Sequence, residues 1–398
     1  MLAGQEISVL GAGIGGLAVA RALALRGAKV RVYEQATEIA EVGAGLQISP
    51  NGFAVLRGLG LDAGLAAKAQ PGEAVELVDG TTGDLVARIN LLSQAPRGEF
   101  LFAHRADLIE VLANGARDAG VDIVLGHRIE EVGLGDGPPR LVTANGQSED
   151  VPLLIGADGL HSRVRTGLNG AAAPFFTQQV AWRATVPGDA AMPPVARVYM
   201  GAGKHLVTYP LRGGALRNIV AVEERRTWVE ESWSLTDDPL ALRIAFADFV
   251  PEVRGWLDRI ERPNLWGLFR HPVAPVWHGH GAVILGDAAH PTLPFLAQGA
   301  NMALEDAWVL ADCLAATTSG DAAFSAYQAH RKTRCLRIVE AANANARNYH
   351  LSGVRRDVGH AVLRVTSRFA PNVLANRFRW LYGHDVTQKR QVAEPARA

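Results

Sequence analysis

Short apolar runs and glycine turns alternate at the start of the chain. Residues 6–10 form an apolar run rich in Ile, Val and Leu, and residues 17–25 are strong helix formers that end before Gly27. Residues 29–34 form a second strand-like run that ends in the acid Glu34. This order predicts a βαβ unit, whose two parallel strands are joined by a right-handed crossover.

Later apolar runs predict further strands. Residues 121–125, 151–159 and 282–285 contain short apolar runs bounded by turn residues, which is typical of buried parallel strands. Residues 72–92 alternate between apolar and polar positions and predict a β meander. Residues 178–223 form several strand-like runs separated by Gly and Pro. Strands of the parallel type therefore come from both ends of the chain, with a β-rich stretch between them.

Helical patterns dominate the second half of the chain. We expect helices over residues 239–258, from 302 to about 348, and over much of 354–381. Nearer the N-terminus, residues 43–52 predict a glycine-rich loop that leads into a helix through Leu59.

Composition narrows the class of protein. A chain of 398 residues that is 48% hydrophobic is long enough for two domains with their own cores. The formal net charge of +0 lacks the positive excess that is typical of nucleic-acid-binding proteins. No segment of the sequence is long and apolar enough to span a bilayer. Cys313 and Cys335 provide no disulfide framework. We therefore expect a cytoplasmic protein without nucleic-acid partners, a membrane span or a bound metal.

The glycine turn after the first strand predicts a dinucleotide site. Gly11, Gly13 and Gly16 allow a tight turn, close approach of the backbone to phosphate, and close packing of the helix. The N-terminus of that helix favours a pyrophosphate. Glu34 is positioned to accept hydrogen bonds from the adenosine ribose hydroxyls. The candidate contacts are completed by neighbours in the same unit: Ile14, Gly15 and Gln35.

A second glycine turn and helix start near residue 290. Asp287 follows a buried strand and a glycine, so its carboxylate is expected to bind a ribityl hydroxyl, although a helix-capping role is the alternative. The next helix begins with free N–H groups that suit the N1–C2=O edge of a flavin, and its candidate residues are Gly299, Ala300, Asn301 and Met302. Two separate helix N-termini in one chain predict FAD, held along its full length.

Other candidate cofactor residues leave two interpretations open. Arg105 starts a helix and either clamps the cofactor or forms an ion pair with Asp107. Asp158 either contacts a nucleotide or braces the turn that it begins. Gly45 and Leu125 complete the set of candidate contacts to the cofactor.

These elements predict an α/β fold in which a GxGxxG Rossmann-like FAD-binding domain carries an inserted β-rich substrate domain and C-terminal helices. The FAD-binding domain is discontinuous, over residues 1–71, 98–170 and 268–350. The substrate domain covers 72–97 and 171–267, and residues 351–398 form a C-terminal helical segment.

The motifs together resemble those of single-component (class A) FAD-dependent aromatic hydroxylases, in particular the salicylate hydroxylase-like branch. The matching motifs are the Gly11–Gly16 turn, the segment 156–165 around Asp158, and Gly286-Asp287 with Pro294. The tail at 378–385 is also similar. The resemblance implies one noncovalent FAD that is reduced by NADH or NADPH. Because the sequence shows no separate motif for a pyridine nucleotide, we expect this reductant to bind only transiently. The resemblance also implies reaction of the reduced flavin with O2 and hydroxylation of an aromatic ring through a flavin C4a-hydroperoxide. Contact of Arg105 with FAD is implied as well.

The candidate catalytic residues are His205 and Tyr209. These residues are four apart on a predicted strand, so their side chains lie on the same face of it. The family that the chain resembles also has a His and a Tyr in such a segment. His205 could accept the proton of a ring hydroxyl because its ordinary pKa lies near neutrality. The alternative is a solvent-facing His and a core Tyr. The expected substrate pocket also contains Gln47, Pro294 and Phe295. Arg183 is an arginine that could bind a carboxylate of the substrate.

The expected substrate is a small hydroxylated aromatic or N-heteroaromatic ring, and the enzyme is expected to be a monomer or homodimer. Two alternatives use the same fold: a flavin halogenase or reductase, and a non-catalytic flavin-binding redox sensor. No two tryptophans have the Trp-x-Trp spacing typical of the halogenases.

Overall fold

The computed structural model describes residues 2–39, 44–93, 95, 98–225 and 236–388. A six-stranded sheet forms one half of the molecule, in the order β18-β19-β12-β1-β2-β8. Five of its strands are parallel, and β18 is antiparallel to its neighbour. The bounds of the strands are β1 (Glu6–Leu10), β2 (Lys29–Tyr33), β8 (Asp122–Val124), β12 (Leu154–Gly156), β18 (His278–Gly279) and β19 (Ala282–Ile284). The predicted βαβ unit therefore lies at the centre of this sheet.

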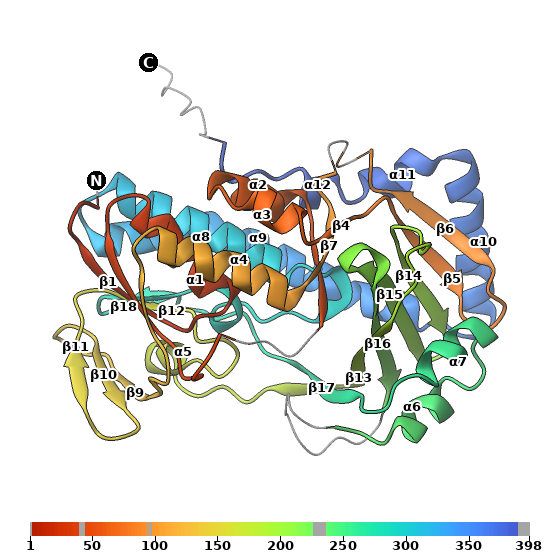
Figure 1. Cartoon of the computed structure of the whole chain (residues 1–398), viewed down its shortest axis with the longest axis horizontal. Helices are drawn as coiled ribbons and strands as arrows, with labels where there is room; N and C mark the ends of the chain where they lie inside the picture. The colour runs from red at the N-terminus through yellow and green to blue at the C-terminus, as the bar shows by residue number, and fades with distance from the viewer. Residues whose placement is uncertain (1, 40–43, 94, 96–97, 226–235, 389–398) are drawn as a thin grey trace.

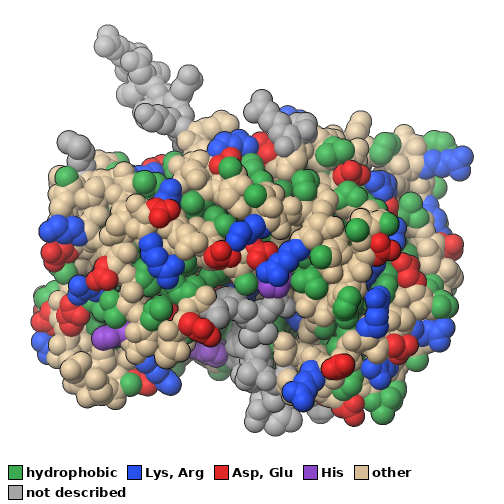
Figure 2. Space-filling view, viewed as in Figure 1, with side chains coloured by type: hydrophobic (Ala, Val, Ile, Leu, Met, Phe, Trp, Pro, Cys, Tyr) green, Lys and Arg blue, Asp and Glu red, His purple; other side chains and the backbone are tan. Residues whose placement is uncertain are grey.

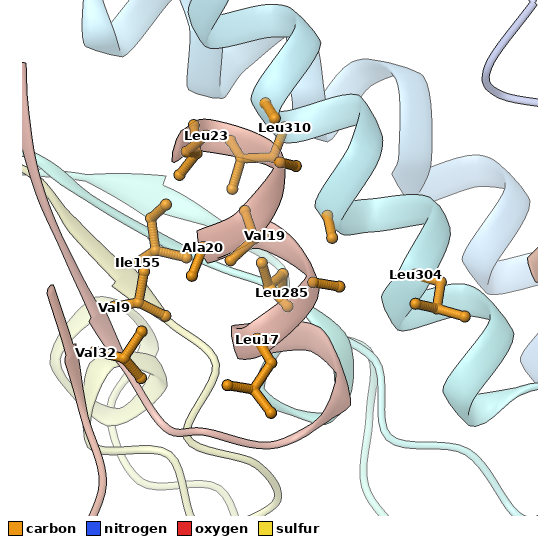
Figure 3. Close-up of a cluster of buried hydrophobic side chains, with 14 of the residues drawn as sticks. Val9, Leu17, Val19, Ala20, Leu23, Val32, Ile155, Leu285, Leu304 and Leu310 are labelled. Carbon is orange, nitrogen blue, oxygen red and sulfur yellow. The ribbon is translucent and has the colours of Figure 1, made fainter. Parts of the chain in front are cut away.

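Helix α1 (Ile14–Ala24) follows β1 and packs against α4 (Arg105–Asp118) and α8 (Gly299–Ala316). Figure 3 shows aliphatic side chains of α1 between the sheet and α8, including Leu17, Val19 and Leu23. Val9 and Ile155 project from two neighbouring strands into the same cluster. Full burial of one such side chain stabilises the fold by about 1.5–3 kcal/mol, so this cluster fixes the start of α1 and α8 relative to the strand ends.

A seven-stranded sheet forms the other half, in the order β17-β13-β16-β15-β14-β5-β6. Neighbouring strands are antiparallel except for the parallel pair β14 and β5. The bounds are β5 (Ala74–Asp79), β6 (Leu85–Asn90), β13 (Phe175–Pro187), β14 (Val195–Gly201), β15 (Lys204–Leu211), β16 (Leu216–Glu224) and β17 (Asn264–Arg270). The two segments assigned to the substrate domain by sequence thus contribute strands to one sheet, and β17 runs past the proposed boundary at residue 267.

Two three-stranded sheets complete the β-structure. One contains β3 (Gly45–Ile48), β7 (Leu101–His104) and β4 (Gln70–Pro71), and the other contains β9 (Ile129–Gly133), β10 (Arg140–Thr143) and β11 (Ser148–Asp150). The prediction of a loop over residues 43–52 is wrong for residues 45–48, because they pair with β7 in antiparallel register. Gly43 lies outside the described residues.

The C-terminal helices run along both halves in Figure 1. The predicted helix from 302 to 348 is two helices, α8 and α9 (Gly320–Tyr349), because the chain turns at residues 317–319 and the Ser319 side chain caps α9. Helix α10 (Gly353–Phe369) packs against the edge strand β6. The remaining helices are α2 (Pro50–Gly58), α3 (Asp62–Ala66), α5 (Arg163–Asn169), α6 (Pro239–Ala245), α7 (Pro251–Leu257), α11 (Pro371–Asn376) and α12 (Arg379–Tyr382).

The predicted helix over 239–258 is also divided, into α6 and α7. Pro251 occupies the first turn of α7, where a missing N–H costs nothing. In the part of the chain that the structure describes, helices long enough to cross a bilayer are not sufficiently apolar to do so. Acidic and basic side chains are interspersed over the face shown in Figure 2, in keeping with the balanced composition.

Candidate active site

A cavity of about 790 Å³ lies between the two large sheets. Its walls come from the starts of α1 and α8, from β3, from the inner face of the seven-stranded sheet, and from the C-terminal helices. A volume of this size is sufficient for a flavin ring together with a small aromatic molecule.

The glycine turn between β1 and α1 requires glycine at two positions for steric reasons. Gly11 has φ +103°, and a Cβ there would lie 2.5 Å from the carbonyl oxygen of Ala157. A Cβ on Gly16 would lie 1.9 Å from the carbonyl oxygen of Gly11. A Cβ on Gly13 would meet nothing within 4 Å, so open space lies beside the N-terminus of α1. That space and the N-terminal dipole fit the pyrophosphate of FAD.

Gly13, Ile14 and Gly15 line the cavity. Glu34, Gln35 and Leu125 do not; they lie at the carboxyl ends of β2 and β8, beyond the glycine turn. The Glu34 carboxylate accepts hydrogen bonds from the N–H groups of Ala12 (2.8 Å) and Ala36 (2.9 Å). Glu34 therefore also holds the glycine turn in place.

The second glycine turn directly follows β19, as the sequence predicts, and forms a short 3-10 helix over Gly286–Ala288. Gly286 has φ +60°, and Asp287 projects into the cavity. Desolvation raises the pKa of the Asp287 carboxyl, and the nearby His290 and Arg105 oppose this rise. Gly299 and Ala300 also line the cavity, so the N-terminus of α8 faces the same space as Asp287.

The Asn301 side chain makes contacts that the sequence does not predict, and the Met302 N–H differs from its prediction. The Asn301 side chain is buried, accepts a hydrogen bond from the Ser49 N–H (3.0 Å) and donates one to the Gln47 carbonyl (3.0 Å). It therefore joins α8 to β3. The prediction of a free N–H at Met302 is wrong, because this N–H donates to the Gln298 carbonyl (2.8 Å) as part of the helix.

Behind this turn lies a buried ion cluster. Asp306 accepts hydrogen bonds from Arg331 (2.7 Å) and from the Gly286 N–H (3.0 Å), and it pairs with His290. The charged partners hold the pKa of Asp306 well below its ordinary value, and Asp306 raises that of His290. His290, Asp306 and Cys335 have a spacing that could hold a metal ion, but Arg331 donates to both Asp306 and Cys335. The cluster therefore anchors the Asp287 turn to α8.

Asp158 and Arg105 are the two residues with alternative interpretations. The Asp158 carboxylate accepts hydrogen bonds from the Ser162 hydroxyl and from the Arg163 N–H (2.7 Å), so it braces the start of α5. Its neighbours Ala157 and Gly159, rather than Asp158, line the cavity. Arg105 lines the cavity at the start of α4, and its N–H donates to the Ala44 carbonyl (2.9 Å).

Asp107, the alternative partner of Arg105, binds another arginine in the structure. The Asp107 carboxylate binds the Arg212 guanidinium through two hydrogen bonds of 2.6 and 3.0 Å. Asp107 thereby connects α4 to the turn after β15.

His205 and Tyr209 lie on β15, are both buried, and both line the cavity. The alternative of a solvent-facing histidine is wrong. Burial raises the pKa of the Tyr209 phenol, so Tyr209 is neutral at physiological pH. Burial and the neighbouring His350 hold the pKa of His205 well below its ordinary value, so the imidazole is also neutral.

Gln47, Pro294 and Phe295 line the cavity as well. The centroid of the Phe295 ring lies 5.6 Å from that of His205. Gly45 is needed for close approach, because a Cβ there would lie 2.7 Å from both the Tyr209 ring and the Asn218 side chain. The Gly45 N–H donates to the Asn218 side chain (2.8 Å).

Arg183 is the cavity-lining residue with the most unusual environment. Desolvation lowers its pKa to about 10, and its guanidinium lies 4.3 Å from the centroid of the Trp266 ring. Its buried Nε has no hydrogen-bond acceptor among the described residues. A carboxylate is a ligand that a cation in such a position favours.

Sequence reasoning missed the contribution of the C-terminal helices. Side chains at the end of α9 and on the following helices line the cavity beside β15, and they include Tyr349, Leu363, Arg377 and Tyr382. Asn218 was also missed. These residues belong to no motif with fixed spacing, so only their convergence in space identifies them.

Comparisons with known proteins agree with this architecture. Residues 5–344 match the family model described as FAD binding domain. The chain is 34% identical to a 3-hydroxybenzoate 6-hydroxylase of Polaromonas naphthalenivorans, with 96% of each chain covered. It is 32% identical to a 6-hydroxynicotinate 3-monooxygenase of Bordetella bronchiseptica, over 85% of this chain and 91% of the relative.

The chain belongs to the FAD-binding family of aromatic hydroxylases. A solved structure of a salicylate hydroxylase substrate complex has the same fold, with a TM-score of 0.81, 24% identity and 96% of each chain covered. Klebsiella pneumoniae HpxO in complex with FAD and uric acid has a TM-score of 0.82, with 24% identity, 94% of this chain and 96% of that chain covered.

These findings confirm the predicted fold class, the family resemblance and the FAD cofactor. The chain is a flavin-dependent monooxygenase of the aromatic hydroxylase class, which uses NAD(P)H and O2. Three relatives matched by sequence, at 32–35% identity, are named for action on hydroxybenzoate, aminohydroxybenzoate and hydroxynicotinate.

Proposed function

We propose that this enzyme hydroxylates a small aromatic acid that carries both a hydroxyl and a carboxylate group. The observation that supports this most directly is the pairing of a neutral His205 and a desolvated Arg183 in one cavity. Three relatives of 32–35% identity, which are named for hydroxybenzoate, aminohydroxybenzoate and hydroxynicotinate, act on rings with these two kinds of substituent. The alternatives of a halogenase, a reductase or a redox sensor do not require His205 and Arg183 in the same cavity.

His205 acts as the general base in this proposal. A ring becomes a better nucleophile when its hydroxyl loses a proton, and a positioned base of this kind contributes roughly 10²–10⁴-fold to a rate. A histidine whose pKa lies well below its ordinary value remains unprotonated at neutral pH and can accept that proton. Tyr209 remains a neutral phenol, so its hydroxyl can donate a hydrogen bond to the developing phenolate.

Arg183 and the apolar walls orient the ring. The Arg183 guanidinium binds the carboxylate, and its stacking on Trp266 limits the directions in which the pair can lie. Phe295 and the aliphatic side chains of the cavity exclude water from the reacting positions. The starts of α1 and α8, with Asp287 and Arg105, would hold the FAD.

When bound and reduced, FAD supplies the two electrons and the activated oxygen for the reaction. One atom of O2 enters a C–H bond of the ring as a hydroxyl group. The other atom leaves as water, and NAD(P)H is oxidised to NAD(P)⁺. The absence of a separate nucleotide-binding fold in the sequence motifs supports only transient binding of the pyridine nucleotide.

The test compares rings that differ only in the carboxylate. NAD(P)H oxidation, O2 consumption and product formation are measured with 3-hydroxybenzoate, 4-hydroxybenzoate, 6-hydroxynicotinate and the corresponding amides. We expect at least one acid to stimulate oxidation and form product, with its amide at least about tenfold poorer in kcat/KM, since one charge-assisted contact is worth about 1.5–3 kcal/mol. The Arg183→Met variant should lose most of this discrimination. Equal rates with acid and amide in the wild-type enzyme would contradict the role of Arg183.

A cytoplasmic location is part of this proposal. Cys313 and Cys335 are both unbridged, which suits a reducing compartment that also supplies NAD(P)H. Measurement of the enzyme in fractionated cells tests this assignment, and recovery with secreted proteins would contradict it.

A further inference from the structure

A chain of hydrogen-bonding side chains leads from His205 to the protein surface. Nδ1 of His205 lies 2.6 Å from Nε2 of His350, and Nδ1 of His350 lies 2.7 Å from Oε1 of Glu224. The side chain of His350 is 2% exposed and that of Glu224 is 53% exposed. The chain therefore begins in the cavity, passes through the protein interior and ends at an exposed carboxylate.

The carboxylate determines which nitrogen of each imidazole carries the proton. An ionised Glu224 can only accept, so Nδ1 of His350 must donate to it. In a neutral imidazole the other nitrogen is then an acceptor, so Nε2 of His350 accepts from Nδ1 of His205. The same reasoning leaves the lone pair of His205 on Nε2, the nitrogen that remains for a ligand in the cavity. Glu224 thereby keeps the distant His205 in the tautomer that a base requires.

Backbone hydrogen bonds fix the positions of Glu224 and His350 relative to each other. Gly203, in the turn between β14 and β15, has φ +67°, and its carbonyl accepts from the Glu224 N–H (2.9 Å). The Gly203 N–H faces the His350 carbonyl at 3.4 Å. His350 itself follows the last residue of α9, so the end of that helix is fixed beside the turn.

The other charged groups next to the chain are paired elsewhere. Lys204 on β15 binds Asp248 (2.7 Å) and the Ala245 carbonyl (2.6 Å). Glu223 on β16 accepts from Arg225 (2.9 Å). Tyr349 on α9, whose ring centroid lies 5.2 Å from that of His205, has its pKa raised to about 12 by burial and is neutral. Glu224 is therefore the ionic group to which His350 is directly bonded.

Burial makes the protonated form of His205 unfavourable, so His205 needs a partner that can take a proton from it. Acceptance of a proton would place a cation in a site that desolvates it fully, and the low pKa of His205 expresses this cost. Transfer of the Nδ1 proton to His350 removes the charge from the cavity. His350 has its pKa lowered by burial, but its hydrogen bond to Glu224 opposes this effect, so a proton that reaches His350 is stabilised by the carboxylate.

We propose that His205, His350 and Glu224 form a proton relay that carries the proton of the substrate hydroxyl from the cavity to solvent. This inference rests on the proposed role of His205 as the base. The O–H bond of the ring breaks as an N–H bond forms at Nε2 of His205. The Nδ1 proton of His205 passes to Nε2 of His350, and the Nδ1 proton of His350 passes to Glu224, which releases it to water. One proton leaves, and no group in the relay is oxidised or reduced.

The first experiment needs no substrate. The FAD-loaded enzyme is labelled with ¹⁵N-histidine, and the ring nitrogens are assigned by comparison with His205→Ala and His350→Gln. The relay predicts that His205 and His350 are neutral and protonated at Nδ1. A proton on Nε2 of His205 would overturn the proposed relay, whatever the enzyme turns over.

The second experiment compares three variants with the wild-type enzyme on the aromatic acid that it hydroxylates fastest. Glu224→Gln retains an acceptor for His350 but cannot take up a proton, and His350→Gln interrupts the path. We expect both to lower kcat at least about tenfold with KM changed less than about twofold, and to lose the wild-type pH profile. Glu223→Gln, a neighbouring carboxylate outside the relay, should behave as wild type.

The outcomes separate the relay from the proposed function. Wild-type kcat and pH profile in Glu224→Gln and His350→Gln, together with a damaged His205→Ala, would overturn the relay and retain His205 as the base. A fully active His205→Ala, or no turnover of any aromatic acid, would instead overturn the proposed function. Flavin content of each variant shows whether it folds, and the exposed position of Glu224 makes Glu224→Gln the variant least affected by misfolding.

Discussion

The two halves of the cavity are built in different ways. The half that faces the cofactor consists mainly of backbone groups, from the glycine turns and the N-termini of α1 and α8, together with the Asp287 carboxylate. The half that faces the substrate consists of side chains from β13 and β15 and from the end of α9. The first kind of site depends on local chain geometry, and the second depends on contacts between segments far apart in sequence. Variants in the first half should therefore release FAD, and variants in the second should retain FAD but lose turnover.

The largest effect is expected at Gly16. A methyl group there would lie 1.9 Å from the Gly11 carbonyl oxygen, so Gly16→Ala cannot keep the turn and should lose FAD completely. Gly13→Ala meets no protein atom within 4 Å, so its apoprotein should unfold at the wild-type denaturant concentration while its FAD affinity falls about tenfold or more. Flavin content and urea unfolding measure both effects.

Gly255→Ala provides the control for both glycine variants. Gly255 lies in α7, away from the cavity, and a Cβ there also meets nothing within 4 Å. Retention of FAD by Gly16→Ala would show that the turn tolerates a side chain and would contradict the steric account.

A second large effect is expected at Arg331, beneath the cofactor half. Arg331→Met leaves Asp306 buried without its guanidinium partner and leaves Glu305 with Arg334 alone, and removal of one partner from such a buried ion pair typically costs about 3–5 kcal/mol. The pKa of Glu305 is lowered to about 2 from an ordinary value of 4.5. A carboxyl with a lowered folded-state pKa stabilises the protein above pH 4.5, and this stabilisation is lost as the pH falls toward 2. Urea unfolding at several pH values should show this loss in the wild-type protein and a weaker pH dependence in Arg331→Met; equal stability of the two proteins at pH 7 would contradict the account.

The next effect is expected at His205, in the half of the cavity that faces the substrate. His205→Ala should lower kcat roughly 10²–10⁴-fold with FAD content unchanged, because the base is lost while the cofactor half is intact. His330→Ala, an exposed histidine on α9, is the matched control and should be silent. Turnover and flavin absorbance are measured on the same samples, and loss of FAD from His205→Ala would show that the two halves are not independent.

The smallest effect is expected at Tyr209. Tyr209→Phe removes one hydroxyl from the cavity and keeps the packing against Phe102, whose ring centroid lies 5.2 Å away. Loss of one hydrogen bond of about 1 kcal/mol corresponds to about a fivefold fall in kcat/KM. Steady-state kinetics measure this change, and a fall as large as that of His205→Ala would assign the main catalytic role to Tyr209.

The same contrast explains what the sequence could predict. The Gly11–Gly16 turn, Asp287 and the start of α8 were predicted because a short motif dictates a turn and the turn dictates the position of phosphate or ribityl groups. His205 and Tyr209 were predicted to share a face because strand geometry alternates.

Other contacts have no local pattern. His350 is 145 residues from His205, and nothing around the end of α9 marks it as a partner. The side chain of Asn301 faces Gln47, and that of Asp107 faces Arg212, because tertiary packing decides these pairings. The strand at 45–48 was predicted as a loop because its pairing with β7 lies outside the motif.

The central claim is that the cavity hydroxylates an aromatic acid with electrons from NAD(P)H. The most direct test is the ratio of hydroxylated product to NAD(P)H consumed by the FAD-loaded enzyme, with each acid of the panel added in turn. The account predicts that one acid stimulates NAD(P)H oxidation strongly and that most of the NAD(P)H consumed appears as hydroxylated product. Failure of every acid to stimulate oxidation, or stimulation that yields only hydrogen peroxide with every acid, would contradict it.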